Sequence, residues 1–169
     1  LGSNAFVIDN NNKIYGKMFV LEKPSLIEHV FSNQCFIHPT VTGKTKWFKD
    51  NPYNISAIRM EDAELWSRTI TTASFENLNK SLLYYRQAGT PYLSKYLKSQ
   101  KGFRKLIYSN GNKKFKLILY SYLKSLIFIF ISVLRLQNYF FKKRHNNISV
   151  ETISEEQMSL EKSILKKIN

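Results

Sequence analysis

The chain has 169 residues, 43% of them hydrophobic, which is enough for one ordinary domain with a real core plus an appendage. Its net charge of +14 is typical of a nucleic-acid binder, but residues 1–76 sum to zero, whereas residues 77–150 hold fifteen Lys or Arg and no acid. A single cysteine, Cys35, excludes an internal disulfide, favours a reducing compartment, and is expected to be a small buried hydrophobe. Because the chain begins without Met or a signal sequence, we expect a fragment of a longer protein.

The first half of the sequence predicts strands and helices in alternation. Residues 4–20 predict a hairpin, because apolar runs flank Asp9-Asn10-Asn11-Asn12, residues that tolerate turn conformations. Three segments follow: a helix over 24–32, a buried strand over 35–43 that His38-Pro39 interrupts, and a loop with aromatic anchors over 46–54.

The stretch RMEDAELWSR, residues 59–68, predicts a helix of about three turns. Leu65 and Trp66 begin one buried stripe, and Glu64 and Arg68 can form an ion pair on the other side. A strand that ends near Arg86 follows. Strands alternating with helices in this way indicate an α/β or α+β fold.

After residue 90 the sequence becomes basic and apolar. Residues 92–108 predict an amphipathic helix, and residues 113–144 contain the most apolar piece of the chain, with basic clusters at both ends. We therefore divide the chain into three parts: an α/β part over 1–90, a basic and apolar helical extension over 91–145, and a polar tail over 146–169.

Glu61 and Asp62 have two interpretations. Acids in the first turn of a helix are common, because the positive end of the helix dipole stabilises a carboxylate by about 0.3–1 kcal/mol. A pair of carboxylates can also do general acid–base work. The residue types alone favour the first interpretation, and a functional one needs support from the surrounding sequence.

That support is the order of motifs around the pair. CFIHPTVTGKTKWF, then RMEDAELWSR, then SLLYYR resembles the C-terminal half of the family 2 glycosyltransferase domain, which has a GT-A fold. The resemblance covers about residues 1–90. It implies a partial GT-A fold that lacks its N-terminal nucleotide-binding half, in an enzyme that transfers a sugar with inversion to a glycan or a lipid-linked acceptor in surface polysaccharide synthesis.

The resemblance also implies roles for individual residues. Asp62 would be the general base that accepts the proton of the acceptor hydroxyl, and Glu61 would orient the acceptor or the base. Four more side chains would bind the acceptor: His38, Thr40, Trp66 and Arg68. Residue type leaves alternatives open for these, since His38 can simply satisfy a polar turn, Trp66 can belong to the core, and Arg68 can be the partner of Glu64.

The family also binds a nucleotide-diphospho-sugar donor through a divalent metal, Mg or Mn, held by an Asp-x-Asp motif. The aspartates here, Asp9, Asp50 and Asp62, are not spaced in that way. We therefore predict that no residue of this chain binds donor or metal, and that the missing N-terminal half of the same domain is its partner. Alone, the chain is expected to be inactive. Ala63 also stands where an aromatic residue commonly follows the acidic pair.

The apolar segment over 117–134 contains Lys124, and a charge in mid-helix argues against a simple membrane-spanning helix. Residues 113–144 instead fit an interfacial helix on an anionic membrane surface, which predicts a peripheral protein on the cytoplasmic face of the cell membrane. The alternative is a helix that packs on the domain.

Two rival functions come from other classes. One is a non-catalytic membrane-surface binding module. The other is a nucleic-acid binder, because aromatic residues that could stack on bases interleave with lysines: Tyr84, Tyr85, Tyr92, Tyr96, Phe103 and Tyr108. We rank the last one lowest and expect no nucleic-acid partner, since no recognisable nucleic-acid motif accompanies the charge.

Overall fold

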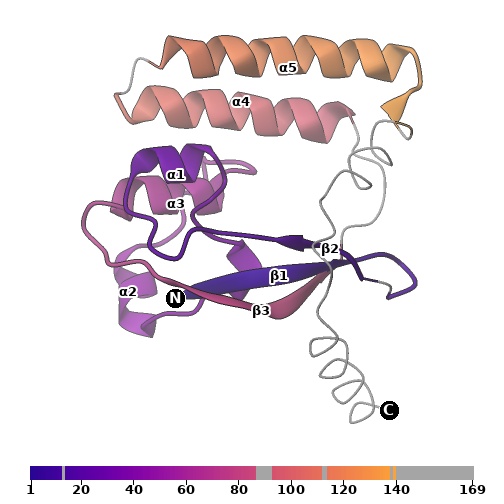
Figure 1. The fold of residues 1–169 in the computed structure, drawn as a ribbon. Coiled ribbons are helices and arrows are strands. Elements are labelled where there is room, and N and C mark those ends of the chain that lie inside the picture. The colour runs from indigo at the N-terminus through magenta and orange to yellow at the C-terminus, as the bar shows by residue number, and fades with distance from the viewer. Residues whose placement is uncertain (13, 87–92, 112–113, 138, 140–169) are drawn as a thin grey trace.

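A computed structural model describes residues 1–12, 14–86, 93–111, 114–137 and 139. Within them the chain is mixed α/β, with a small three-stranded sheet and five α-helices (Figure 1). The elements in chain order are β1 (Gly2–Ile8), β2 (Ile14–Met18), α1 (Ile27–Phe31), α2 (Thr45–Asp50), α3 (Glu61–Thr69), β3 (Asn77–Arg86), α4 (Leu93–Ser109) and α5 (Phe115–Val133).

The sheet has the order β2-β1-β3, with β2 antiparallel and β3 parallel to the central strand. The predicted hairpin is confirmed as β1 and β2. Residues of the turn itself stabilise the turn of this hairpin. The Asn11 N–H donates to Asp9 Oδ1 at 2.8 Å, and Asn12 adopts a left-handed φ of 62°, which asparagine tolerates. Arg86, at the end of β3, donates to the Asp9 carbonyl and to Asn12 Oδ1, so it fastens this turn to the sheet.

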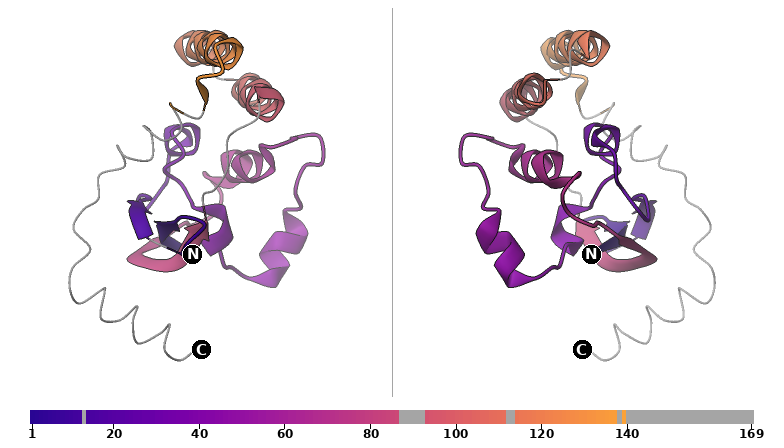
Figure 2. Two further views of the ribbon diagram at one scale, coloured as in Figure 1. Left: turned by 90° about the vertical axis from the view of Figure 1, so that its right-hand side faces the viewer. Right: turned by 90° about the vertical axis from the view of Figure 1, so that its left-hand side faces the viewer.

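Four of the five described helices, α1, α3, α4 and α5, lie on one side of the sheet in successive layers, and α2 lies beside the strands (Figure 1). Figures 1 and 2 show α1 and α3 next to the strands, α4 above them, and α5 as the outermost layer. The parallel pair β1 and β3 needs a crossover connection, and α1, α2 and α3 form it. The predicted helices over 24–32, 59–68, 92–108 and within 113–144 are confirmed as α1, α3, α4 and α5.

The predicted strand over 35–43 is wrong. Residues His38–Thr40 form a 3₁₀ turn, closed by hydrogen bonds from the Thr40 and Val41 N–H groups to the Ile37 and His38 carbonyls. β1 already pairs with β2 on one side and β3 on the other, so no edge beside it is open to another strand. The segment contacts β1 through Thr40, whose hydroxyl accepts the Ser3 N–H at 3.0 Å. Just before β1, Leu1 and Thr42 exchange two backbone hydrogen bonds of 2.8 and 2.9 Å.

The predicted loop over 46–54 is wrong in its first half, because Thr45–Asp50 is the helix α2. Its two aromatic residues are anchors, as predicted. Trp47 and Phe48 pack against the buried core around Leu65 and Trp66. A six-residue helix has too little length to show a hydrophobic period, and here the packing of these rings fixes its conformation.

Two clusters of buried residues hold the layers together. The first lies between α1 and α3 and contains Val30, Cys35, Leu65, Trp66 and Ile70. The second joins α1 to the C-terminal helices and contains Phe31, Leu106, Ile107 and Ile118. Burial raises the pKa of the Cys35 thiol to about 12, so this cysteine is the small buried hydrophobe that the sequence predicted. The C-terminal helices therefore share a core with the α/β part.

Replacing Leu65 by Ala should lower the free energy of unfolding by about 2–5 kcal/mol, because the side chain is fully buried and its loss leaves a cavity. Urea denaturation followed by circular dichroism measures the change. Leu82→Ala is the matched control, since this leucine is largely exposed and its truncation should cost far less. Equal losses for the two variants would contradict the placement of Leu65 in the core.

Candidate functional site

The acidic pair occupies the first turn of α3, where the helix has no side-chain cap. Met60 precedes the helix in a non-helical conformation, and the Glu64 N–H makes the first helical bond to its carbonyl at 2.8 Å. Asp62 Oδ1 accepts the Ala63 N–H at 2.8 Å, so one carboxylate oxygen satisfies a backbone donor and fixes the side chain. The positive end of the helix dipole favours the negative charge here. Asp62 is half-buried and Glu61 is exposed.

Tyr53 lies beside this pair, on the loop that follows α2. Its pKa is raised above the usual value for tyrosine, first by burial and then by the negative charges of Asp62 and Glu61. The Tyr53 hydroxyl shares a hydrogen bond of 2.8 Å with His38 Nε2. The structure thus brings together His38, Tyr53 and the two carboxylates, which come from three separate segments of the chain.

Trp66 lies one helical turn after Asp62, and its ring packs beneath His38. Its ring is only 3% exposed, and it contacts Phe36, Trp47 and Phe75 at centroid distances of 4.9, 6.5 and 5.9 Å. The His38 ring stands edge-on to it at 6.3 Å. Of the two alternatives that the sequence left open for Trp66, the structure places it in the core.

Thr40 and Arg68 are both occupied by structural contacts. The Thr40 hydroxyl donates to the Ile37 carbonyl at 2.8 Å and accepts the Ser3 N–H at 3.0 Å, which ties the 3₁₀ turn to β1. Arg68 pairs with Glu64 at 3.2 Å, as the i, i+4 spacing predicted, and it also donates to the Pro52 carbonyl. Since Pro52 precedes Tyr53, Arg68 holds the loop that presents Tyr53 against α3.

Tyr53 lies between the two motifs on which the resemblance depends, but reasoning from the sequence gave it no role. In the sequence Tyr53 lies in the loop between His38 and the acidic pair. No regular spacing along the chain predicts that Tyr53 contacts either of them. The contact arises because α2 turns the chain back and Arg68 holds the following loop, and neither is visible as a periodic pattern.

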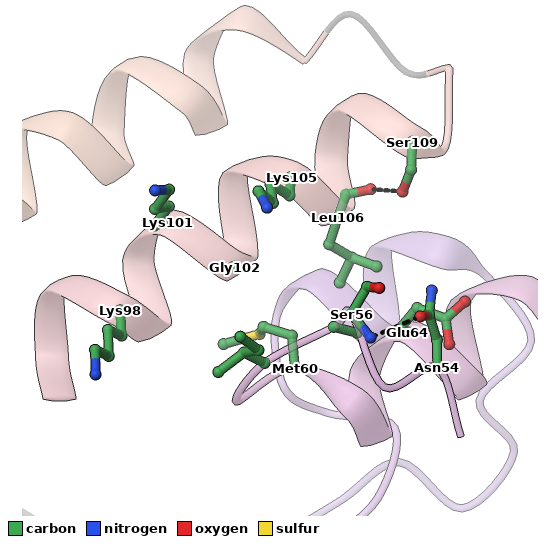
Figure 3. A pocket seen from close by; sticks show the side chains of 12 residues that line it. Asn54, Ser56, Met60, Glu64, Lys98, Lys101, Gly102, Lys105, Leu106 and Ser109 are labelled. Atoms are coloured by element: carbon green, nitrogen blue, oxygen red, sulfur yellow. Dashed lines mark hydrogen bonds between the residues drawn. The ribbon is translucent and has the colours of Figure 1, made fainter. Parts of the chain in front are cut away.

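A cavity of about 440 Å³ lies on the other side of α3, between the loop over 54–60 and α4 (Figure 3). Its apolar wall includes Ile58, Met60 and Leu106, and the lysines of α4 stand along it: Lys98, Lys101 and Lys105. Glu64 lines this cavity, whereas Asp62, two residues earlier, projects about 200° away around the helix. The cavity and the acidic pair are therefore separate features.

α4 approaches this loop closely through Gly102. A Cβ at this position would lie 2.8 Å from Met60 Cγ and 3.0 Å from the Ile58 carbonyl oxygen, so a side chain would push the two apart. Arg59, which has a left-handed φ of 63°, donates from Nε to Ser99 Oγ of α4 at 2.7 Å. The helix α4 thus supports the loop that leads into the acidic pair.

Three of the aromatic residues that the sequence offered for base stacking contact other rings of the fold. Tyr84 stacks on Phe6 at 5.6 Å, Tyr96 stacks on Phe128 at 4.1 Å, and Phe103 stands edge-on to Phe31 at 6.2 Å. Tyr85 is half-buried on β3 and Tyr108 is exposed on α4. Tyr92 lies outside the described residues. Tyr84, Tyr96 and Phe103 therefore contact three different partner rings.

Among the described residues, no group of three or more His, Cys, Asp or Glu side chains could hold a metal ion. A scan against protein-family models gives no match, and neither does a search of curated proteins or of solved structures.

Asp62→Asn should lower the pKa of Tyr53, because it removes a negative charge that disfavours the tyrosinate. Burial is the larger cause, so the pKa should stay above the usual tyrosine value. NMR titration of tyrosine labelled at Cζ measures it, with the Tyr53 signal assigned through Tyr53→Phe, since the chain has ten tyrosines. Asp50→Asn, at an exposed acid of α2 paired with Lys46, is the control and should leave the pKa unchanged. An equal change of the Tyr53 pKa in both variants would contradict a specific effect of Asp62 on Tyr53.

Proposed function

We propose that the chain is the acceptor side of an inverting glycosyltransferase of the GT-A type, with Asp62 as its general base. The observation that carries the proposal is the position of Asp62, half-buried at the start of α3 beside the hydrogen-bonded pair of His38 and Tyr53. The order of motifs that resembles family 2 glycosyltransferases supports the same assignment.

The proposed step needs one base on the acceptor side. The acceptor hydroxyl oxygen forms a bond to the anomeric carbon of the donor sugar, and the bond from that carbon to the diphosphate oxygen breaks on the opposite face. The diphosphate leaves with the electron pair, and the hydroxyl proton passes to Asp62. Its Oδ1 is held by the Ala63 N–H, so Oδ2 is the oxygen that we assign to the proton.

The neighbours of Asp62 have supporting roles in this proposal. Glu61 is exposed at the same helix start and can accept a second hydroxyl of the acceptor sugar. His38 and Tyr53 offer a donor and an acceptor on the exposed side. Trp66, Thr40 and Arg68 position these groups through the contacts described above, so we assign them to the support of the acceptor site.

We propose that neither the donor nor its metal ion binds to the described residues. They offer no cluster of carboxylates or histidines for a divalent ion, and the sequence has no Asp-x-Asp spacing. We therefore propose that the nucleotide-diphospho-sugar and its Mg or Mn ion bind to the N-terminal half of the domain that the resemblance implies. A glycan or lipid-linked acceptor at the cytoplasmic face of the cell membrane belongs to the same proposal.

Asp62→Asn should lower the rate of sugar transfer by about 10²–10⁴-fold, because asparagine cannot accept the proton. The experiment uses the polypeptide that joins these residues to the donor-binding half, and it follows radiolabelled sugar from a panel of nucleotide-diphospho-sugars into a membrane extract. Donor affinity, measured by calorimetry, should not change. Asp50→Asn is the control and should transfer at the unaltered rate.

Transfer at an undiminished rate by Asp62→Asn would rule out the base assignment. Absence of transfer by the unaltered polypeptide, with every donor in the panel, would instead favour a binding module without catalysis. A loss of transfer caused by misfolding is recognised by circular dichroism, since α3 contributes to the core through Leu65.

A further inference from the structure

The outermost helix, α5, has its polar side turned inward. Ser121 and Ser125 face α4 and are buried, and Arg104 of α4 donates to their hydroxyls at 3.0 and 3.3 Å. Ser121 also donates to Gln100 Oε1 at 2.7 Å. A helix on a water-soluble domain normally buries its apolar stripe and exposes its polar residues. α5 instead buries Ser121 and Ser125 and leaves most of its large apolar side chains exposed.

The outward side of α5 is apolar from Leu119 to Val133. Its large side chains are between 50 and 73% exposed: Leu119, Leu123, Leu126, Ile127, Phe130 and Val133. Figure 2 shows α5 at the periphery of the fold, beyond α4. The helix is long and apolar enough to cross a membrane, yet only 17% of its most apolar window is buried in the structure. A core helix of similar composition would be mostly buried.

Positive charges border this apolar face. Lys116 is exposed in the first turn of α5, and Arg135 is exposed just after the helix ends. Lys124 lies at the margin of the face, with its ammonium 4.3 Å from the centre of the Tyr120 ring. From such a margin a long lysine side chain can reach the headgroup layer of a bilayer while its stem stays on apolar surface. No acid lies anywhere in residues 77–150.

The packing of α5 decides its orientation. α5 lies along α4, and α4 shares a core with α1. If α5 crossed a bilayer, α4 would enter the hydrocarbon region with its exposed lysines, including Lys98, Lys101 and Lys105, and each charge there is costly. A helix that lies flat in the interface leaves α4 and the domain in water.

We infer that the outward face of α5 inserts flat into the surface of an anionic lipid bilayer. The apolar side chains enter the boundary between headgroups and acyl chains, and the surrounding Lys and Arg side chains attract the anionic headgroups. This inference does not rest on the proposed sugar transfer. If both hold, the bilayer brings a lipid-linked acceptor to the layer in which the domain lies.

Flotation of the full chain with vesicles tests the inference. The chain should float with vesicles of phosphatidylcholine and phosphatidylglycerol, and much less with phosphatidylcholine alone. The variant Leu123→Gln with Leu126→Gln should weaken binding at least about tenfold, because it removes two inserted side chains without changing the charge. The control, Ile55→Gln with Ile58→Gln, removes two exposed apolar side chains of the loop before α3 and should float like the unaltered chain.

Three outcomes would overturn the inference. The first is a full chain that does not float with anionic vesicles. The second is an equal loss for the α5 variant and the loop control. The third is an unaltered chain that forms dimers without lipid in analytical ultracentrifugation and does not float, together with an α5 variant that is monomeric. The apolar face of α5 would then bind a second copy of the chain.

A second experiment separates a flat helix from a spanning one. A polarity-sensitive fluorophore is attached to a cysteine at Leu126 or at Lys124, which is practical because Cys35, the single native cysteine, is buried. On anionic vesicles, the emission of the probe at 126 should shift to the blue and resist quenching by iodide. The probe at 124 should stay accessible to iodide. Equal protection of both positions would indicate a spanning helix and overturn the flat orientation.

Discussion

The packing of Trp66 is the constraint on which the candidate site depends. Its ring joins segments that are far apart in sequence, because Phe36, Trp47 and Phe75 all close around it. Such aromatic contacts contribute about 0.5–1.5 kcal/mol per pair beyond the burial of area. Asp62 lies one turn earlier on the same helix. The packing of the Trp66 ring therefore fixes the rotation of α3 and with it the direction in which the Asp62 carboxylate points.

The same packing explains why a polar group can gather above an apolar core. His38 and Tyr53 meet at 2.8 Å because the 3₁₀ turn is tied to β1 through Thr40, and the loop after α2 is tied to α3 through Arg68. Asn77 holds the other side of this layer, since its amide donates to the Leu21 and Cys35 carbonyls at 2.7 and 2.8 Å. The supporting residues are thus held by backbone contacts, while the side chains of Glu61, His38 and Tyr53 stay exposed.

The sequence predicts the parts of the fold that have a local period or a local turn. The hairpin follows from the Asp9 and Asn12 turn, and α3, α4 and α5 follow from helical spacing. The 3₁₀ turn at His38 was predicted as a strand, because its residue types suit a strand. In the structure β1 is paired on both sides, and the Thr40 and Val41 N–H groups bond within the turn. For the candidate site, Asp62 and His38 were proposed from motif order, whereas the hydrogen bond of Tyr53 with His38 depends on tertiary packing.

α5 shows most clearly what a period can and cannot predict. The spacing of Ser121, Lys124 and Ser125 predicts one polar stripe, but it does not say which neighbour the stripe faces. Arg104 of α4 holds the two serines of this stripe against α4, whereas Lys124 stays exposed. The Arg104 guanidinium donates hydrogen bonds to both serine hydroxyls and lies 4.2 Å from the centre of the Tyr122 ring. Neutral hydroxyls satisfy its hydrogen bonds without cancelling its charge. The layer between α4 and α5 therefore stays positive, directly beneath the apolar face that we assign to the bilayer.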